Sequence, residues 1–106
     1  SNVTDMSNMF YRCTALNQPF GTWNVGKVTN MDTMFAECPA LNCDLNNWNV
    51  SSVTNMHAMF YNCTNFNGLI TNWNTANVTT MNSMFANASA FNSGKGAVVA
   101  LPRFLN

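Results

Sequence analysis

Residues 53–63 read VTNMHAMFYNC, and three near copies of this stretch begin at Val3, Val28 and Val78. The four copies start 25 residues apart, with no insertion or deletion between them. All eight methionines of the protein lie in these copies, and the second methionine of each copy is followed by phenylalanine. The shared positions are Met6, Met31, Met56 and Met81, then Met9, Met34, Met59 and Met84, then Phe10, Phe35, Phe60 and Phe85. Recurrence at this period is typical of repeat proteins, whose neighbouring units bury a continuous core between them.

The rest of each unit recurs with the same period. A small residue, a large apolar residue followed by asparagine, and a Trp-Asn pair come after the phenylalanine at constant distances. These positions are Cys13, Cys38, Cys63 and Ala88; Leu16, Leu41, Phe66 and Phe91; and Trp23, Trp48 and Trp73. The pattern stops after Asn92. We therefore expect a single solenoid domain, residues 1–106, with repeats 3–27, 28–52, 53–77 and a partial repeat 78–92, and with residues 93–106 as a terminal cap or edge strand.

The spacing of apolar residues predicts one helix and one strand in each unit. Met6, Met9, Phe10 and Cys13 follow the spacing of one face of an α-helix, and the Val-Thr pair before them offers a threonine as helix cap. The expected helices lie near residues 4–13, 29–38, 54–63 and 79–88. Apolar and polar residues alternate at 23–25 and 48–50, which indicates short strands. The predicted fold is α/β, a leucine-rich-repeat-like solenoid with one short helix and one short strand per 25-residue repeat.

The same columns predict the core. Stacked Met, Phe, Leu and Trp positions should be buried, and most deeply in the internal units, because both of their faces are covered. An unvarying asparagine follows the Leu/Phe column, and a buried amide needs hydrogen-bond partners. We therefore expect an internal ladder of side-chain bonds to backbone groups of the turns, made by Asn17, Asn42, Asn67 and Asn92.

The string V-T-x-M-x-x-M-F-x-x-C-x-x-L-N-x-x-L-x-x-W-N-V resembles the BspA-like surface-protein repeat, an Asn- and Met-rich relative of leucine-rich repeats. The resemblance covers residues 1–92 and is most specific at Met6, Met9, Phe10, Trp23 and their copies. It implies a surface or secreted protein of a bacterium or unicellular eukaryote, with a role in adhesion or recognition. It implies no substrate, because the shared positions are structural ones.

Composition excludes several classes of partner. Charged residues make up 8% of the chain, against roughly 25% in average domains, and the formal net charge is zero. The four cations are scattered, so no basic patch is available for nucleic acid. The longest aliphatic run, 97–101, is far shorter than the ~20 residues that span a bilayer. We expect neither nucleic-acid binding nor membrane insertion.

The titratable residues do not form a catalytic pattern. The single histidine, His57, occupies a position where the other units carry Ser7, Asp32 and Asn82, which indicates a variable exposed site. The four acids, Asp5, Asp32, Glu37 and Asp44, fall at four different repeat positions and make no calcium ladder. We therefore predict a protein that is not an enzyme and has no catalytic residues, no cofactor and no metal site.

The cysteines are predicted to be structural. Cys13, Cys38 and Cys63 share one repeat position with Ala88, and alanine replaces a small buried thiol better than it replaces a ligand or a bridge. Helices packed about 8–10 Å apart would also keep these cysteines from bridging one another. Cys43 has no counterpart, and a local Cys38–Cys43 disulfide is the alternative for it.

Two functional hypotheses remain. The first is an extracellular or cell-surface scaffold for adhesion or for protein or glycan recognition; the second is a structural subunit that self-associates end to end into a filament or surface layer. If the tryptophans of the expected strands point inward, their polar neighbours tile one uncharged outer face. The predicted binding residues are Thr22, Asn24, Asn47, Asn49, Asn72 and Asn74. A row of Thr4, Thr29, Thr54 and Thr79 would suit a crystalline surface, but helix capping already accounts for it.

Overall fold

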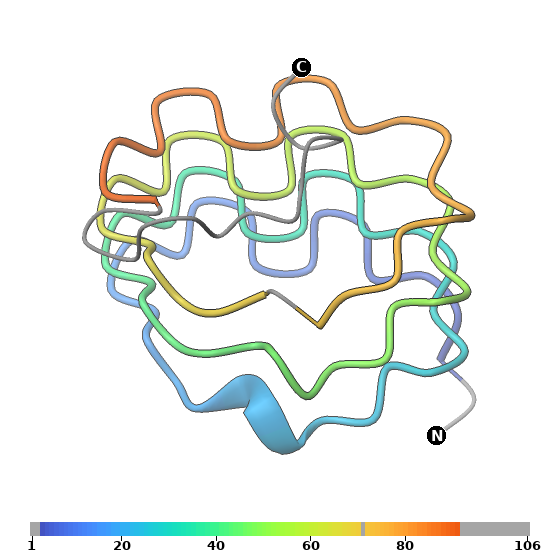
Figure 1. Ribbon diagram of the computed structural model, residues 1–106. Coiled ribbons are helices and arrows are strands. Elements are labelled where there is room, and N and C mark those ends of the chain that lie inside the picture. The colour runs from blue at the N-terminus through green and yellow to red at the C-terminus, as the bar shows by residue number, and fades with distance from the viewer. Residues whose placement is uncertain (1–2, 71, 92–106) are drawn as a thin grey trace.

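Turns and irregular segments, rather than helices and strands, make up almost all of the described backbone. The computed structural model describes residues 3–70 and 72–91 (Figure 1). Within these ranges the one regular element is the 3-10 helix η1, Phe20–Thr22. The helices predicted near residues 4–13, 29–38, 54–63 and 79–88 do not form, and neither do the strands predicted at 23–25 and 48–50. The expected helix-and-strand architecture of a leucine-rich-repeat-like solenoid is therefore wrong for this chain. The cap or edge strand predicted for 93–106 lies outside the described residues.

Left-handed residues explain why the helices do not form. Each predicted helix contains two non-glycine residues with φ between 54° and 63°, and one such residue is enough to interrupt a right-handed helix. They are Asn8 and Arg12, Thr33 and Glu37, Ala58 and Asn62, and Ser83 and Asn87. A positive φ at the third position of a turn closed by a bond from i to i+3 is the geometry of a type II turn. These residues recur every four positions. The turns therefore bury apolar side chains at the same spacing as one face of a helix would.

The backbone N–H groups of these segments are shared between two kinds of partner. Met59 N donates to Met56 O, three residues earlier, at 3.2 Å. Met56 N and Phe60 N instead donate to the next unit, to Thr80 O at 2.8 Å and Met84 O at 2.9 Å. Half of the hydrogen bonds that a helix would keep within itself therefore join neighbouring units.

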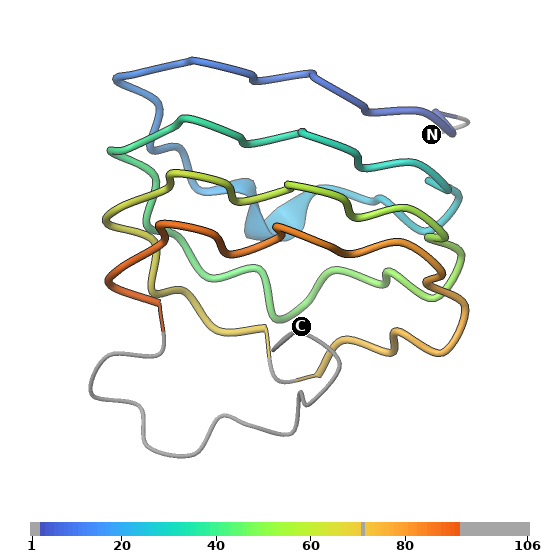
Figure 2. The same ribbon diagram turned by 90° about the horizontal axis from the view of Figure 1, so that it is seen from above.

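Successive units stack in parallel and in register. Isolated parallel bridges join Asp5 to Asn30, Asn30 to Asn55, and Asn55 to Thr80, so each residue pairs with the one 25 positions later. The layers are visible by colour in Figure 1, and Figure 2 shows them from above.

The threonines of the Val-Thr pairs were predicted to cap helices, but they have a different role. Each hydroxyl donates to the backbone carbonyl of the threonine one unit earlier: Thr29 to Thr4 at 3.3 Å, and Thr54 to Thr29 and Thr79 to Thr54 at 3.2 Å. They cap no α-helix, because the described segments contain none. They join the layers instead.

The core is a large aromatic and methionine cluster. Phe35, Phe60 and Phe66 are completely buried. The phenylalanine rings stack from layer to layer, with centroids 5.7 Å apart for Phe35–Phe60 and 5.5 Å apart for Phe60–Phe85. Trp48 and Trp73 stack at 6.5 Å with an interplanar angle of 4°. The Cα radius of gyration is 12.3 Å, close to the about 13 Å expected of a compact chain of this length. The predicted columns are confirmed in the two internal units, and the result is a compact globule with almost no regular secondary structure.

Burial differs between the internal units and the first one. Met34 is 0% exposed and Trp48 is 2% exposed, whereas their counterparts Met9 and Trp23 are 49% and 37% exposed. The same residue types therefore form core where a unit lies on both sides, and surface where the outer side is uncovered.

Candidate functional site

The six residues predicted to form a binding face are all exposed: Thr22, Asn24, Asn47, Asn49, Asn72 and Asn74. Thr22 ends η1, and Val25 and Val50 behind the face are buried. Two of the amides come together at Gly26. A Cβ built on this glycine would lie 3.2 Å from Asn24 Oδ1 and 3.7 Å from Asn49 Nδ2. The structure thus places amide side chains of adjacent layers next to one another on the surface.

In three of these asparagines, the side-chain oxygen is already bonded to the backbone. The Oδ1 atoms of Asn24, Asn49 and Asn74 accept the backbone N–H two residues later, from Gly26 at 3.0 Å, Ser51 at 3.1 Å and Ala76 at 3.0 Å. This is an Asx turn, which asparagine and aspartate both support. The amide NH2 groups are the part left to meet a ligand. The turn has a signal in the sequence, an asparagine two residues before a small residue.

A second row of asparagine side chains bonds to backbone N–H groups in the turn that follows the Met- and Phe-rich segment. Asn42 N donates to Asn17 Oδ1, and Asn67 N donates to Asn42 Oδ1, each at 2.9 Å. The predicted bonds to turn backbone groups are confirmed for Asn17 and Asn42, but the prediction that the ladder is internal is wrong. It lies at the surface rather than inside, since Asn17 and Asn42 are exposed. Asn92, the fourth predicted member, lies outside the described residues.

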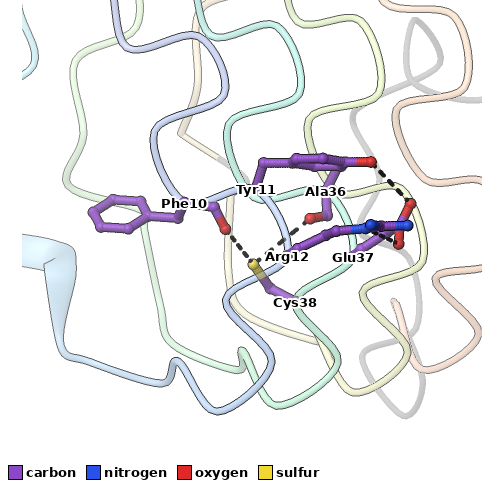
Figure 3. Close-up of polar contacts among 6 residues, drawn as sticks. All are labelled: Phe10, Tyr11, Arg12, Ala36, Glu37 and Cys38. Carbon is purple, nitrogen blue, oxygen red and sulfur yellow. Dashed lines mark hydrogen bonds and ion pairs between the residues drawn. The ribbon is translucent and has the colours of Figure 1, made fainter.

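Charged side chains pair between adjacent layers, which the sequence reasoning missed. Arg12 Nε lies 3.1 Å from Glu37 Oε1, and Tyr11 Oη donates to Glu37 Oε2 at 3.5 Å (Figure 3). His57 Nδ1 lies 3.1 Å from Asp32 Oδ1. Both pairs join residues 25 positions apart, so the repeat period would have found them. Exposed pairs of this kind contribute little to stability, and the Arg12–Glu37 pair balances charge locally.

The described residues contain no group of three His, Cys, Asp or Glu side chains arranged to hold a metal ion. Across the same residues, no helix has the length and hydrophobicity required to cross a bilayer.

The cysteines form a column of free thiols, and Cys38 and Cys63 are buried. Cys38 Sγ donates to Phe10 O at 3.0 Å, and Cys63 Sγ donates to Phe35 O at 2.9 Å (Figure 3 shows the first). The alternative Cys38–Cys43 disulfide does not form. The prediction that Cys13, Cys38 and Cys63 do not bridge one another is confirmed, but the helix spacing given as its reason was wrong, because these cysteines follow turns and not helices. Each thiol is a small donor that joins its layer to the one before.

Burial raises the pKa of the Cys63 thiol to about 12, from an ordinary value of 9.0. The unfolded chain therefore loses this proton at lower pH than the folded chain does. The contribution of the protonated Cys63 thiol to the free energy of unfolding is complete below about pH 9 and is lost as the pH rises toward about 12.

We expect the denaturation midpoint under reducing conditions to fall between about pH 8 and about pH 10.5, and to fall less in Cys63→Ala. Ala88 occupies the equivalent position in its own unit, so the replacement fits the repeat. Chemical denaturation at the two pH values measures the difference. An identical fall in both proteins would show that Cys63 does not titrate as its burial requires.

A family model described as "Mycoplasma protein of unknown function, DUF285" matches residues 1–97. The chain belongs to the DUF285 family. The matched segment includes all the stacked layers of this DUF285 chain and all six exposed face residues. No match was found among curated proteins or among solved structures.

Proposed function

We propose that this DUF285 chain is a non-enzymatic scaffold whose exposed asparagine face recognises a neutral partner, a glycan or an uncharged protein surface. The observation that carries the proposal is the repetition of Asn24, Asn49 and Asn74. Each binds its own backbone through Oδ1 and presents an exposed amide on a neighbouring layer. A row of equal donors gains affinity by repetition and not from one dominant contact.

The surroundings of this face favour an uncharged ligand. The formal net charge of the chain is zero, and the Arg12–Glu37 ion pair balances charge locally. An anionic or cationic partner would find no complementary field. Hydrogen bonds from amide NH2 groups to hydroxyl or carbonyl oxygens need no such field.

The proposal extends to the type of protein. We propose that the stacked units are coils of a solenoid built from turns, related to BspA-like repeats, and that the protein acts in adhesion at a cell surface or outside the cell. Support comes from the 25-residue register of the bridges and hydrogen bonds and from the motif resemblance. A repetitive, uncharged surface suits adhesion, where many weak contacts act together.

The test is a triple variant, Asn24→Asp, Asn49→Asp and Asn74→Asp. Aspartate keeps the Oδ1 acceptor of the Asx turn, as Asp5 does for Ser7 N at 2.8 Å in this chain, but it removes the NH2 donors. We expect the parent protein to be retained on printed neutral oligosaccharides, with little change between about 50 and 500 mM salt. The triple variant should lose at least about tenfold in retention.

The matched control adds the same charges elsewhere: Thr14→Asp, Thr64→Asp and Ser89→Asp, which are all exposed. It should bind like the parent. Undiminished binding by the folded asparagine variant would move the site off this face. Retention only on sialylated oligosaccharides, lost at high salt, would contradict a neutral ligand.

A further inference from the structure

The column of cysteines is held at the spacing of directly paired backbones. Arg12 N donates to Ala36 O at 2.9 Å, one residue before Cys13 and two residues before Cys38. The phenylalanine rings of the same two layers stack with their centroids 5.5 Å apart. Backbones paired in this way lie about 4.8 Å apart, and disulfides join Cα atoms that are about 4.4–6.8 Å apart. Neighbouring cysteines of the column are therefore within bridging range.

The sulfur of Cys38 lies beside the backbone of Cys13. Cys38 Sγ donates to Phe10 O at 3.0 Å, and Cys13 N donates to the same oxygen at 3.1 Å (Figure 3 shows the first bond). Burial raises the pKa of the Cys38 thiol, and the neighbouring N–H of Cys13 offsets part of that rise. Both observations place the Cys38 sulfur next to the residue with which it would form a bridge.

Accessibility distinguishes the two neighbouring pairs of the column. Cys13 is half-buried, whereas Cys38 and Cys63 are buried. A thiol must be reached by an oxidant from solution, and it reacts as the thiolate. Burial raises the pKa of Cys63 to about 12, which leaves almost none of this thiol ionised at neutral pH. Oxidation should therefore begin at Cys13, and its neighbour in the column is Cys38.

We propose that Cys13 and Cys38 form a redox-dependent disulfide that links the layer of residues 3–27 to the layer of residues 28–52. The oxidant is a small disulfide such as oxidised glutathione. The Cys13 thiolate attacks one sulfur of the oxidant, which forms a mixed disulfide and releases one small thiol. The Cys13 side chain then rotates toward Cys38, whose thiolate attacks the Cys13 sulfur and releases the second small thiol. The protein loses two electrons and two protons, and the small disulfide takes them up as two thiols.

The bridge changes how firmly the two layers are joined. It replaces the bond from the Cys38 thiol to Phe10 O, because a disulfide sulfur has no proton to donate. It also closes a loop between residues 25 positions apart, which restricts the unfolded chain and stabilises the folded one. The redox state of the surroundings would thus set the strength of this contact between layers. The proposal does not depend on the asparagine face or on its ligand.

The test uses the Cys43→Ser protein, since the sequence has serine at the equivalent position 93. The reduced protein is equilibrated with mixtures of reduced and oxidised glutathione at about pH 8. Remaining thiols are alkylated, and cleavage after Asp and Glu separates the three cysteines into different peptides for mass analysis. We expect one link, Cys13–Cys38, with an equilibrium constant at least about tenfold larger in the folded chain than in urea. The bridged protein should also unfold at a higher urea concentration than the reduced protein. The unmodified chain should give a link between the same two peptides.

Two alanine variants are the matched controls, because Ala88 fills this column in the fourth unit. Cys63→Ala should oxidise like the Cys43→Ser protein, whereas Cys13→Ala should form no Cys38–Cys63 bridge in the same time. Glutathione that stays on Cys13 while Cys38 remains a free thiol would overturn the proposal. A bridged protein less stable than the reduced one, or faster formation of a Cys38–Cys63 link, would overturn it as well.

Discussion

Phe60→Ala should lower the free energy of unfolding by about 3–5 kcal/mol, the usual cost of removing a fully buried ring. Phe60 is completely buried, and its ring stacks on Phe66 at 4.3 Å, on Phe85 at 5.5 Å and on Phe35 at 5.7 Å. Neighbours on both layers are held in register by backbone bonds, so they cannot collapse into the cavity. Chemical denaturation monitored by tryptophan fluorescence gives the difference.

The same substitution at Phe10 is the matched control. Phe10 holds the equivalent position but is only half-buried, and it has a stacked layer on one side, with Phe35 at 5.5 Å. Its loss should cost clearly less than the loss of Phe60, because part of its surface already meets water. Equal losses at the two positions would contradict the idea that stability resides in contacts between layers.

Gly68→Ala is expected to have the second large effect, about 3 kcal/mol or more, because there is no space for a methyl group. A Cβ at Gly68 would overlap the backbone of Cys43, lying 2.8 Å from its carbonyl carbon and closer still to the oxygen. Backbone cannot rotate away as a side chain can. The substitution must therefore push two layers apart. A lower denaturation midpoint and increased alkylation of the half-buried Cys43 would report the separation.

Gly26→Ala is the comparison for this prediction. At Gly26 the nearest atom to an added Cβ is Asn24 Oδ1 at 3.2 Å, the end of a side chain that can shift. Gly26→Ala should lower the free energy of unfolding by less than about 1 kcal/mol. A Gly68→Ala protein as stable as Gly26→Ala would show that the layers are not in close contact at Cys43.

The candidate site was predictable in its location but not in its chemistry. Alternation around Val25 and Val50 correctly placed Asn24 and Asn49 outside. Alternation does not reveal that each Oδ1 is occupied by a backbone N–H two residues on. That bond depends on the chain bending at Gly26 and Ser51. The pairing of Arg12 with Glu37 was equally hidden, since it joins residues that only stacking brings together.

What the sequence by itself determined is the 25-residue period, the members of the core columns and the uncharged character of the surface. These follow from residue type and position alone, because similar units that stack bury equivalent positions wherever a unit lies on both sides. Only the tertiary structure decided the backbone conformation. The spacing of Met56, Met59, Phe60 and Cys63 fits a helix and a row of turns equally well. The choice depends on whether Met56 N and Phe60 N bond within their own unit or to Thr80 O and Met84 O of the next. Those partners lie 24 residues away, so the conformation of each unit is set by the unit stacked against it.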